Sequence, residues 1–246
     1  MNRVLVWFSC GAASAVASKM AIEKYGDRVE ILYCDTLKYE HPDNLRFMAD
    51  VEKWIGRKVT ILKSKKYEDI YDVFNKTRWL VGVNGARCTT EMKKVPRMEY
   101  QQPDDIHVFG YTADEKKRIE IFESNNPELY TDWILYTAGV KKSDCYRILK
   151  ENGIELPSMY KLGYRNNNCI GCVKGQAGYW NKIRIDFPGI FEKMAKTERE
   201  IGAAINKKYV KGVRIPVYLD ELQPNAGRYR SEPDIECGVQ CVGAKP

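Results

Sequence analysis

The chain has 246 residues, 44% of them hydrophobic, with eight cysteines and a formal net charge of +7. That length supports one substantial α/β core with a small extension. The first apolar run, residues 4–8, is too short for a signal peptide or a membrane span, so we expect a cytoplasmic protein without membrane contact. The positive charge suits a polyanionic ligand, such as a phosphorylated nucleotide or nucleic acid, although a solvated basic surface explains it more simply.

Strands alternate with helices through about residue 155. The hydrophobic pattern predicts strands at residues 3–8, 29–34, 58–62 and 106–110, and helices at 15–25, 42–55, 67–75, 89–100, 113–123 and 144–151, the last with Ser143 as its N-cap. Such alternation implies right-handed crossovers and an open parallel sheet with helices on both faces. Ligands of these sheets bind at the carboxyl ends of the strands.

The pattern changes after Pro157. Residues 163–178 are rich in glycine and asparagine, residues 188–208 are expected to form one amphipathic helix, and the tail from residue 212 is mostly irregular. We therefore divide the chain into a sheet domain at 1–160 and a second segment at 161–246 that carries a Cys-x-x-Cys loop, the helix and a cysteine-bearing tail.

Small residues fill the turn after the first predicted strand. This turn, residues 9–14, lies where the strand meets a helix N-terminus, so backbone N–H groups and the helix dipole can hold an anion there. Its candidate contacts are Ser9, Gly11 and Ser14. Asp35 and Thr36 follow the second strand at the same sheet edge, where they can address a ribose or a base. The simpler interpretations are an ordinary strand-to-helix turn and an N-cap cluster.

Cys169 and Cys172 have the spacing that lets two thiolates bind one metal ion or cluster, and their loop is not an apolar element. Eight cysteines are too few for a disulfide scaffold in a chain of this size. Four-cysteine ligation of zinc or an iron–sulfur cluster needs two more ligands, from Cys88, Cys145, Cys237 and Cys241. Cys10 and Cys34 adjoin strands and are expected to be packing residues.

Together these segments resemble the phosphoadenylyl-sulfate (PAPS) and adenylyl-sulfate (APS) reductase family, within the larger group of PP-loop adenine-nucleotide enzymes. The match covers about residues 4–172, with a weaker similarity at Cys237. Residues 9–14 resemble the PP-loop, and Asp35-Thr36 the family's Asp-Thr segment. The stretch from Gly163 to Cys172 is similar to the family's Gly-Tyr and CxxC stretch, most of all in members encoded by bacteriophages and mobile elements.

The resemblance implies further roles. It implies an adenine nucleotide (PAPS, APS or ATP) held by the PP-loop, the Asp-Thr segment and four residues of similar family segments: Lys93, Gly110, Glu115 and Arg118. It also implies Cys237 as nucleophile, with Cys241 or a thioredoxin-like protein as the second thiol. A 4Fe-4S cluster, or alternatively zinc, would be held by Cys88, Cys145, Cys169 and Cys172.

Some positions depart from the family pattern. Ala13 stands where ATP-splitting PP-loop enzymes have an aspartate, which weakens Mg-assisted adenylation. Thr89 replaces the second cysteine of a Cys-Cys pair, so Cys145 enters the ligand set as a substitute. Thr112 stands where an arginine is usual, which removes one strong anion contact. Cys241 is an additional cysteine, so Cys237 and Cys241 fit metal ligation as well as catalysis.

The leading hypothesis is a sulfonucleotide reductase-like oxidoreductase in which a thiolate attacks the sulfur of the bound nucleotide. The alternative is a PP-loop nucleotide-dependent sulfurtransferase that modifies nucleic acid. A third hypothesis is a non-catalytic adenine-nucleotide-binding protein. A homo-oligomer is compatible with all three.

Overall fold

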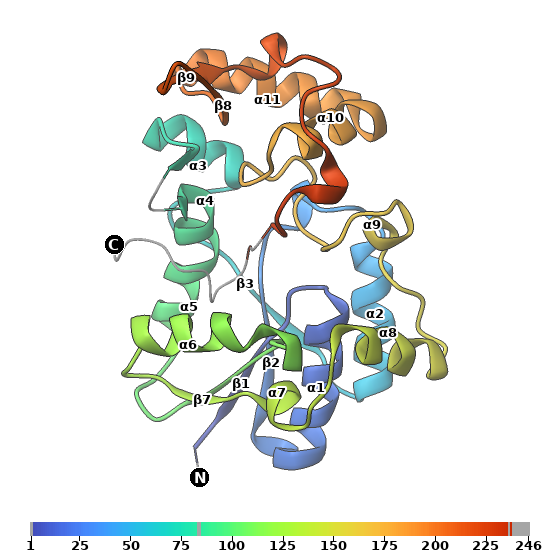
Figure 1. The fold of residues 1–246 in the computed structure, drawn as a ribbon. Coiled ribbons are helices and arrows are strands. Elements are labelled where there is room, and N and C mark those ends of the chain that lie inside the picture. Colours follow the sequence, from blue (N-terminus) through green and yellow to red (C-terminus); the bar gives the residue numbers. More distant parts are fainter. Residues whose placement is uncertain (1, 83–84, 236, 238–246) are drawn as a thin grey trace.

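Figure 1 shows the fold in a computed structural model, which describes residues 2–82, 85–235 and 237. A five-stranded parallel sheet has the order β3-β2-β1-β6-β7. Its strands are β1 (Val4–Trp7), β2 (Val29–Cys34), β3 (Val59–Leu62), β6 (Ile106–Phe109) and β7 (Tyr130–Asp132). The predicted open parallel sheet is confirmed. Strands β2 and β3 are added on one side of β1, and β6 and β7 on the other side, so the strand order reverses between β1 and β6. Folds of this kind bind ligands at that point.

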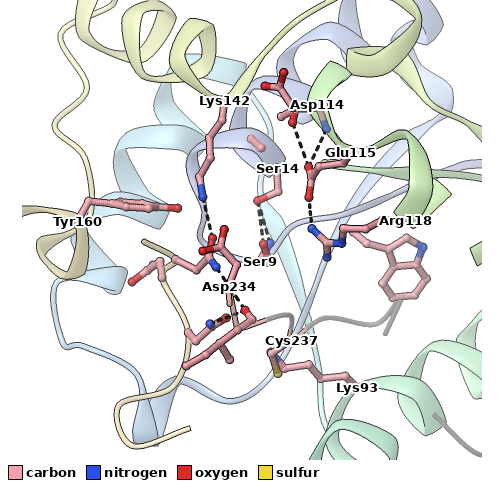
Figure 2. A pocket seen from close by; sticks show the side chains of 18 residues that line it. Ser9, Ser14, Lys93, Asp114, Glu115, Arg118, Lys142, Tyr160, Asp234 and Cys237 are labelled. Atoms are coloured by element: carbon pink, nitrogen blue, oxygen red, sulfur yellow. Dashed lines mark hydrogen bonds and ion pairs between the residues drawn. The ribbon is translucent and has the colours of Figure 1, made fainter. Parts of the chain in front are cut away.

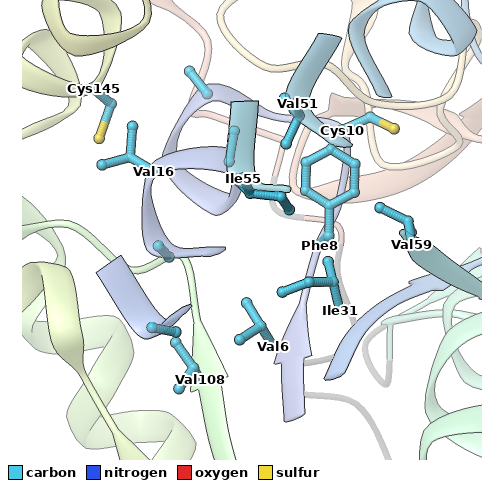
Figure 3. Close-up of a cluster of buried hydrophobic side chains, with 14 of the residues drawn as sticks. Val6, Phe8, Cys10, Val16, Ile31, Val51, Ile55, Val59, Val108 and Cys145 are labelled. Atoms are coloured by element: carbon cyan, nitrogen blue, oxygen red, sulfur yellow. The ribbon is translucent and has the colours of Figure 1, made fainter. Parts of the chain in front are cut away.

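Helices cover both faces of the sheet. On one face, α1 (Ala12–Tyr25), α2 (Asn44–Ile55) and α8 (Lys142–Glu151) pack on the inward side chains of β1, β2 and β6, and Figure 3 shows the resulting apolar core. The other face packs against α5 (Val95–Tyr100) and α6 (Lys116–Asn125) through a smaller core around Phe109 and Phe122. Burial on both faces explains why β1 reads as a continuous apolar run.

A third core lies outside the sheet. It joins residues 67–92, which include α3 (Ile70–Thr77) and α4 (Arg87–Thr89), to α9 (Ser158–Lys161), α10 (Ala177–Asp186) and α11 (Pro188–Ile201). Trp180 of α10 is fully buried in it. This core contains residues from both sides of the expected boundary at residue 160, so the division of the chain there remains a prediction.

Two expectations about the elements are wrong. The helix expected to run to residue 208 ends at Ile201, because Gly202 adopts the left-handed conformation with φ of 78°. The chain then forms a two-stranded hairpin of β8 (Asn206–Val210) and β9 (Val213–Val217). Ser143 is not an N-cap, since α8 begins at Lys142.

Short elements complete the chain. Strands β4 (Val81–Gly82) and β5 (Gly85–Ala86) pair with each other, a π-helical turn spans Thr90–Lys94, and α7 (Ile134–Thr137) follows β7. Within the described residues, no helix has both the length and the apolar character needed to cross a membrane.

Candidate functional site

A cavity of about 340 Å³ lies at the carboxyl ends of β1 and β6, where the order of the strands reverses. Figure 2 shows the side chains around it. The predicted nucleotide contacts that line this cavity are Ser9, Ser14, Lys93, Gly110, Glu115 and Arg118. They come from the loop after β1, the π-helical turn, the end of β6 and the start of α6, so the fold gathers segments more than 100 residues apart in the chain.

The loop between β1 and α1 is shaped by its own hydrogen bonds. Cys10 has φ of 53°, an uncommon conformation for a residue with a side chain. Asn167 supports that turn by donating from Nδ2 to the Cys10 carbonyl at 2.7 Å. The hydroxyl of Ser14 accepts from the Ser9 N–H at 3.1 Å and donates to the Gly11 carbonyl at 3.0 Å. The loop is therefore formed before any ligand arrives.

Gly110 permits the close approach of β6 to this loop. A Cβ atom at Gly110 would lie 2.7 Å from the Ser14 nitrogen, so any side chain would collide with the loop backbone. Gly11 is the N-cap of the 14-residue α1, and no side chain caps that end. The Ala12 N–H lies against the Tyr160 hydroxyl, and the following N–H groups of the first turn face the cavity side of α1, where an anion can bind.

Charged side chains of both signs surround the cavity. Glu115 accepts from the Thr112 N–H at 2.9 Å and pairs with Arg118, so it is the capping residue of a helical turn and orients Arg118. Lys142 donates to the Arg165 carbonyl at 2.8 Å. Burial lowers the pKa of Lys142, and the carboxylate of Asp234 opposes that shift. Such lysines and arginines can bind the phosphate and sulfate groups of a nucleotide.

Asp35 and Thr36 lie away from the cavity. The Thr36 hydroxyl donates to Glu40 at 2.6 Å in a buried position. Asp35 faces Lys63, with 4.0 Å between the carboxylate and the amine, and lines a separate lysine-rich depression. Although both residues follow a strand at the ligand-binding edge, the structure does not bring them to the other predicted contacts.

Cys237 lines the cavity and is half-buried, beside Lys93 in Figure 2. The pKa of its thiol lies well below the ordinary value, because Cys172 donates a hydrogen bond to it and the positive charge of Lys93 favours the thiolate against the effect of burial. The hydroxyl of Thr89 lies 3.7 Å from its sulfur. Burial would lower the pKa of Lys93, but the negative charges of Cys237 and Glu40 raise it, so Lys93 keeps its charge.

The predicted metal ligands separate into two places. Cys88, Cys169 and Cys172 lie near Cys237, and the charge of Cys237 raises the pKa of Cys88 and Cys169 in addition to the larger effect of burial. Cys145, a residue of α8, instead packs into the sheet core. Across residues 2–82, 85–235 and 237, no group of three or more His, Cys, Asp or Glu side chains is arranged to hold a metal ion. The described cysteines as placed therefore do not fit a bound zinc ion or cluster.

We name residues 229–235, together with Cys237, the strap. It is held by residues of the glycine- and asparagine-rich loop and of α10. Arg165 donates to the carbonyls of Tyr229, at 3.0 Å, and Glu232. Asn168 donates to the Ile235 carbonyl at 3.0 Å. The carboxylate of Glu232 accepts from the Gly178 and Tyr179 N–H groups. Cys237 is thus positioned over the cavity, while Cys241 lies outside the described residues.

The sequence prediction missed several cavity residues. They include Lys142, Tyr160, Asn166, Asn167 and Asp234. The run of three asparagines before Cys169 was a visible signal, because asparagine in a glycine-rich loop often hydrogen-bonds to backbone groups. Lys142 and Tyr160 gave no signal, since only the packing of α8 and α9 beside α1 brings them to the cavity.

No family model matches this chain. An uncharacterized protein of Methanocaldococcus jannaschii is 23% identical over 210 residues, which make up 80% of this chain and 42% of that protein, so the chain spans less than half of its length. The crystal structure of phosphoadenylyl-sulfate (PAPS) reductase from Candida auris, a phosphate complex, aligns with a TM-score of 0.52 and 15% identity over 69% of this chain and 82% of that one. The chain therefore has a fold similar to that of a PAPS reductase.

Proposed function

We propose that the protein is a sulfonucleotide reductase-like enzyme that acts on PAPS or APS. The observation that carries the proposal is the position of Cys237: a thiol with a lowered pKa lines the same cavity as the open N-terminus of α1. A low thiol pKa is typical of nucleophilic cysteines. The likeness to PAPS reductase and the family motifs around Ser9 and Cys169 support the same function.

In the proposed reaction, the N-terminus of α1 and the cations Arg118 and Lys142 bind the phosphosulfate. The Cys237 thiolate attacks the sulfur atom. A bond forms between the two sulfur atoms, the bond from sulfur to the bridging phosphate oxygen breaks, and the adenine nucleotide leaves with the electron pair. The product on the enzyme is a thiosulfonate at Cys237.

A second thiol completes the reaction. It attacks the Cys237 sulfur, releases sulfite and leaves a disulfide, which a thioredoxin-like dithiol then reduces. Cys241 and the external protein are the candidates from the sequence, and Cys172 joins them because it hydrogen-bonds to Cys237. A cytoplasmic location would supply such reductants.

Mass spectrometry of the intact protein after incubation with PAPS or APS tests the proposal. We expect a sulfonate adduct on Cys237 that dithiothreitol removes with release of sulfite. The C237S variant should form no adduct, whereas C145S, which changes a core cysteine outside the cavity, should form it as the wild type does. An adduct that persists in C237S would reject the assignment of Cys237.

The metal remains a separate prediction, since the described cysteines do not fit one and no step above uses it. Anaerobic purification followed by iron, sulfide and zinc analysis tests it. Stoichiometric iron and sulfide that are lost in C169S would show that the cysteines rearrange around a cluster. A metal-free protein that still forms the adduct would exclude a requirement for metal.

A nucleotide-dependent sulfurtransferase is the second candidate. The observation in its favour is that the carboxylates of Asp114 and Asp234 line the cavity, where they can bind the Mg²⁺ that accompanies ATP. Release of pyrophosphate from ATP, without adduct formation from PAPS or APS, would favour it. Tight nucleotide binding with neither reaction would indicate a binding protein.

A further inference from the structure

The β8–β9 hairpin stands out from the rest of the surface. Its two strands pair only with each other, and every residue of 207–214 is exposed. At its tip, Lys211 and Gly212 have φ of 51° and 81°, as a tight two-residue hairpin turn requires. In Figure 1 the hairpin lies beside α11 at the end of the molecule away from the sheet. A two-stranded ribbon has little stability by itself. We therefore ask which partner could bind this exposed hairpin.

The hairpin is strongly basic. Residues 206–217 contain Lys207, Lys208, Lys211 and Arg214 and no acidic residue. Among the described residues, none of these four cations takes part in an ion pair, whereas Arg199 on the adjacent α11 is paired with Asp220 and Glu221. The charge of the hairpin is therefore available to a polyanionic partner.

Its cations point to more than one side. Lys207 pairs in register with Pro216 and Tyr209 with Arg214, so Lys207 and Arg214 share one face of the ribbon. Lys208 lies on the opposite face, and Lys211 lies at the tip. Tyr209 and Val213, 64% and 63% exposed, add apolar contact area among the charges.

We infer that the β8–β9 hairpin binds double-stranded DNA by entering the major groove. That groove admits a two-stranded ribbon and has phosphates along both walls, which matches cations on both faces and at the tip of the ribbon. The deep, narrow major groove of duplex RNA excludes such a ribbon. The inference does not depend on the reductase proposal, because the hairpin shares no residue with the cavity.

The test measures anisotropy of a labelled duplex DNA of arbitrary sequence with the full-length protein at increasing salt. Four phosphate contacts predict that affinity falls roughly 100-fold between about 50 and 200 mM salt. The variant K207S/K208S/K211S/R214S should bind at least about tenfold more weakly at low salt, with a salt dependence close to zero. The variant K207R/K208R/K211R should bind as the wild type does.

A matched control removes the same charge elsewhere. The variant K53S/K58S/K150S/K161S changes four exposed lysines around α2, α8 and α9 and should retain binding. Equal weakening in this control would show that net charge alone attracts DNA and would overturn the inference. Equal binding of duplex RNA, or wild-type DNA binding by the hairpin variant, would also overturn it. Circular dichroism of each variant confirms that the chain is folded.

Discussion

Around the parallel sheet, backbone hydrogen bonds run from strand to strand, whereas around α10 and α11 side chains hold the loop backbone. Asn181 donates to the carbonyls of Gln223 and Ala226, and Arg184 to those of Leu219 and Leu222. Glu198 and Glu232 each accept from two backbone N–H groups. Irregular segments that are buried need such partners, because an unpaired buried polar group is unfavourable.

The difference has a consequence for the candidate site. The sheet half supplies the preformed loop after β1, whose hydrogen bonds rest on the apolar packing of β1 and α1 on either side of it. The other half supplies Cys237 through the strap, which depends on a few polar side chains such as Arg165 and Glu232. We expect mutations in the sheet half to lower global stability, and polar mutations in the second half to displace Cys237 as well.

The largest effect is expected in the sheet half. Phe47 of α2 is fully buried and its ring stacks 6.4 Å from that of Phe8. Phe47→Ala should lower the free energy of unfolding by about 3–5 kcal/mol, because it leaves a cavity in a close-packed core. Urea denaturation measures this loss. Leu45→Ala, on the exposed side of the same helix, is the control and should change stability little. A small loss in Phe47→Ala would contradict the description of this core.

Glu232 tests the second half, which is built around α10 and α11. Glu232→Gln should lower the free energy of unfolding by about 2–4 kcal/mol, because an amide replaces a charged acceptor facing two backbone N–H groups. It should also change the rate at which iodoacetamide labels Cys237. Glu200→Gln on α11 is the matched control, since its ion pair with Lys196 is exposed and contributes little. Unchanged labelling in Glu232→Gln would show that this carboxylate does not position Cys237.

His107, in the sheet, predicts a loss of stability in acid. The Trp7 indole N–H donates to His107 Nδ1 at 3.0 Å, and burial lowers the pKa of His107 from 6.5 to about 4. The unfolded chain therefore takes up the proton first, and stability falls as the pH drops from 6.5 to about 4, by at most about 3 kcal/mol. Glu198 titrates over part of the same range with the opposite effect, so the dependence of stability on pH is measured by urea denaturation in the Glu198→Gln variant.

Glu198, in the second half, predicts the opposite slope. Burial raises the pKa of Glu198 from 4.5 to about 7, although two backbone N–H groups favour its charged form. The folded protein thus holds the proton longer, and stability falls as the pH rises from 4.5 to about 7, by at most about 3 kcal/mol. His107→Gln should reveal this slope in the same assay. If stability changed with pH in the same direction in both variants, the contrast between the halves would be refuted.

The smallest effect should be equal in both halves. Gly56 and Gly202 end α2 and α11 in the left-handed conformation, with no atom near the position of an added Cβ. Alanine at either position should lower the free energy of unfolding by about 1 kcal/mol, because the strain is confined to the local backbone. Thermal unfolding of the two variants compares them, and a loss that differs between them by more than the experimental error would show that the surrounding structure contributes.

Most elements of the sheet half were predictable from local patterns. The continuous apolar runs at residues 4–8 and 29–34 and the helical spacing in residues 42–55 are properties of neighbours in the chain. The hairpin after α11 was not predicted, because lysine-rich residues 206–210 continue a polar helical pattern and only the stop at Gly202 separates them from α11.

The sequence by itself determined the parallel α/β architecture and the loop at residues 9–14, since hydrophobic periodicity and small-residue turns are local signals. Tertiary structure decided which of the predicted residues meet. It buried Thr36 against Glu40, placed Cys145 in the sheet core and brought Cys237 to Lys93 and Cys172. A cysteine has the same local pattern whether it is a ligand, a nucleophile or a packing residue, so only contacts between distant segments separate these roles.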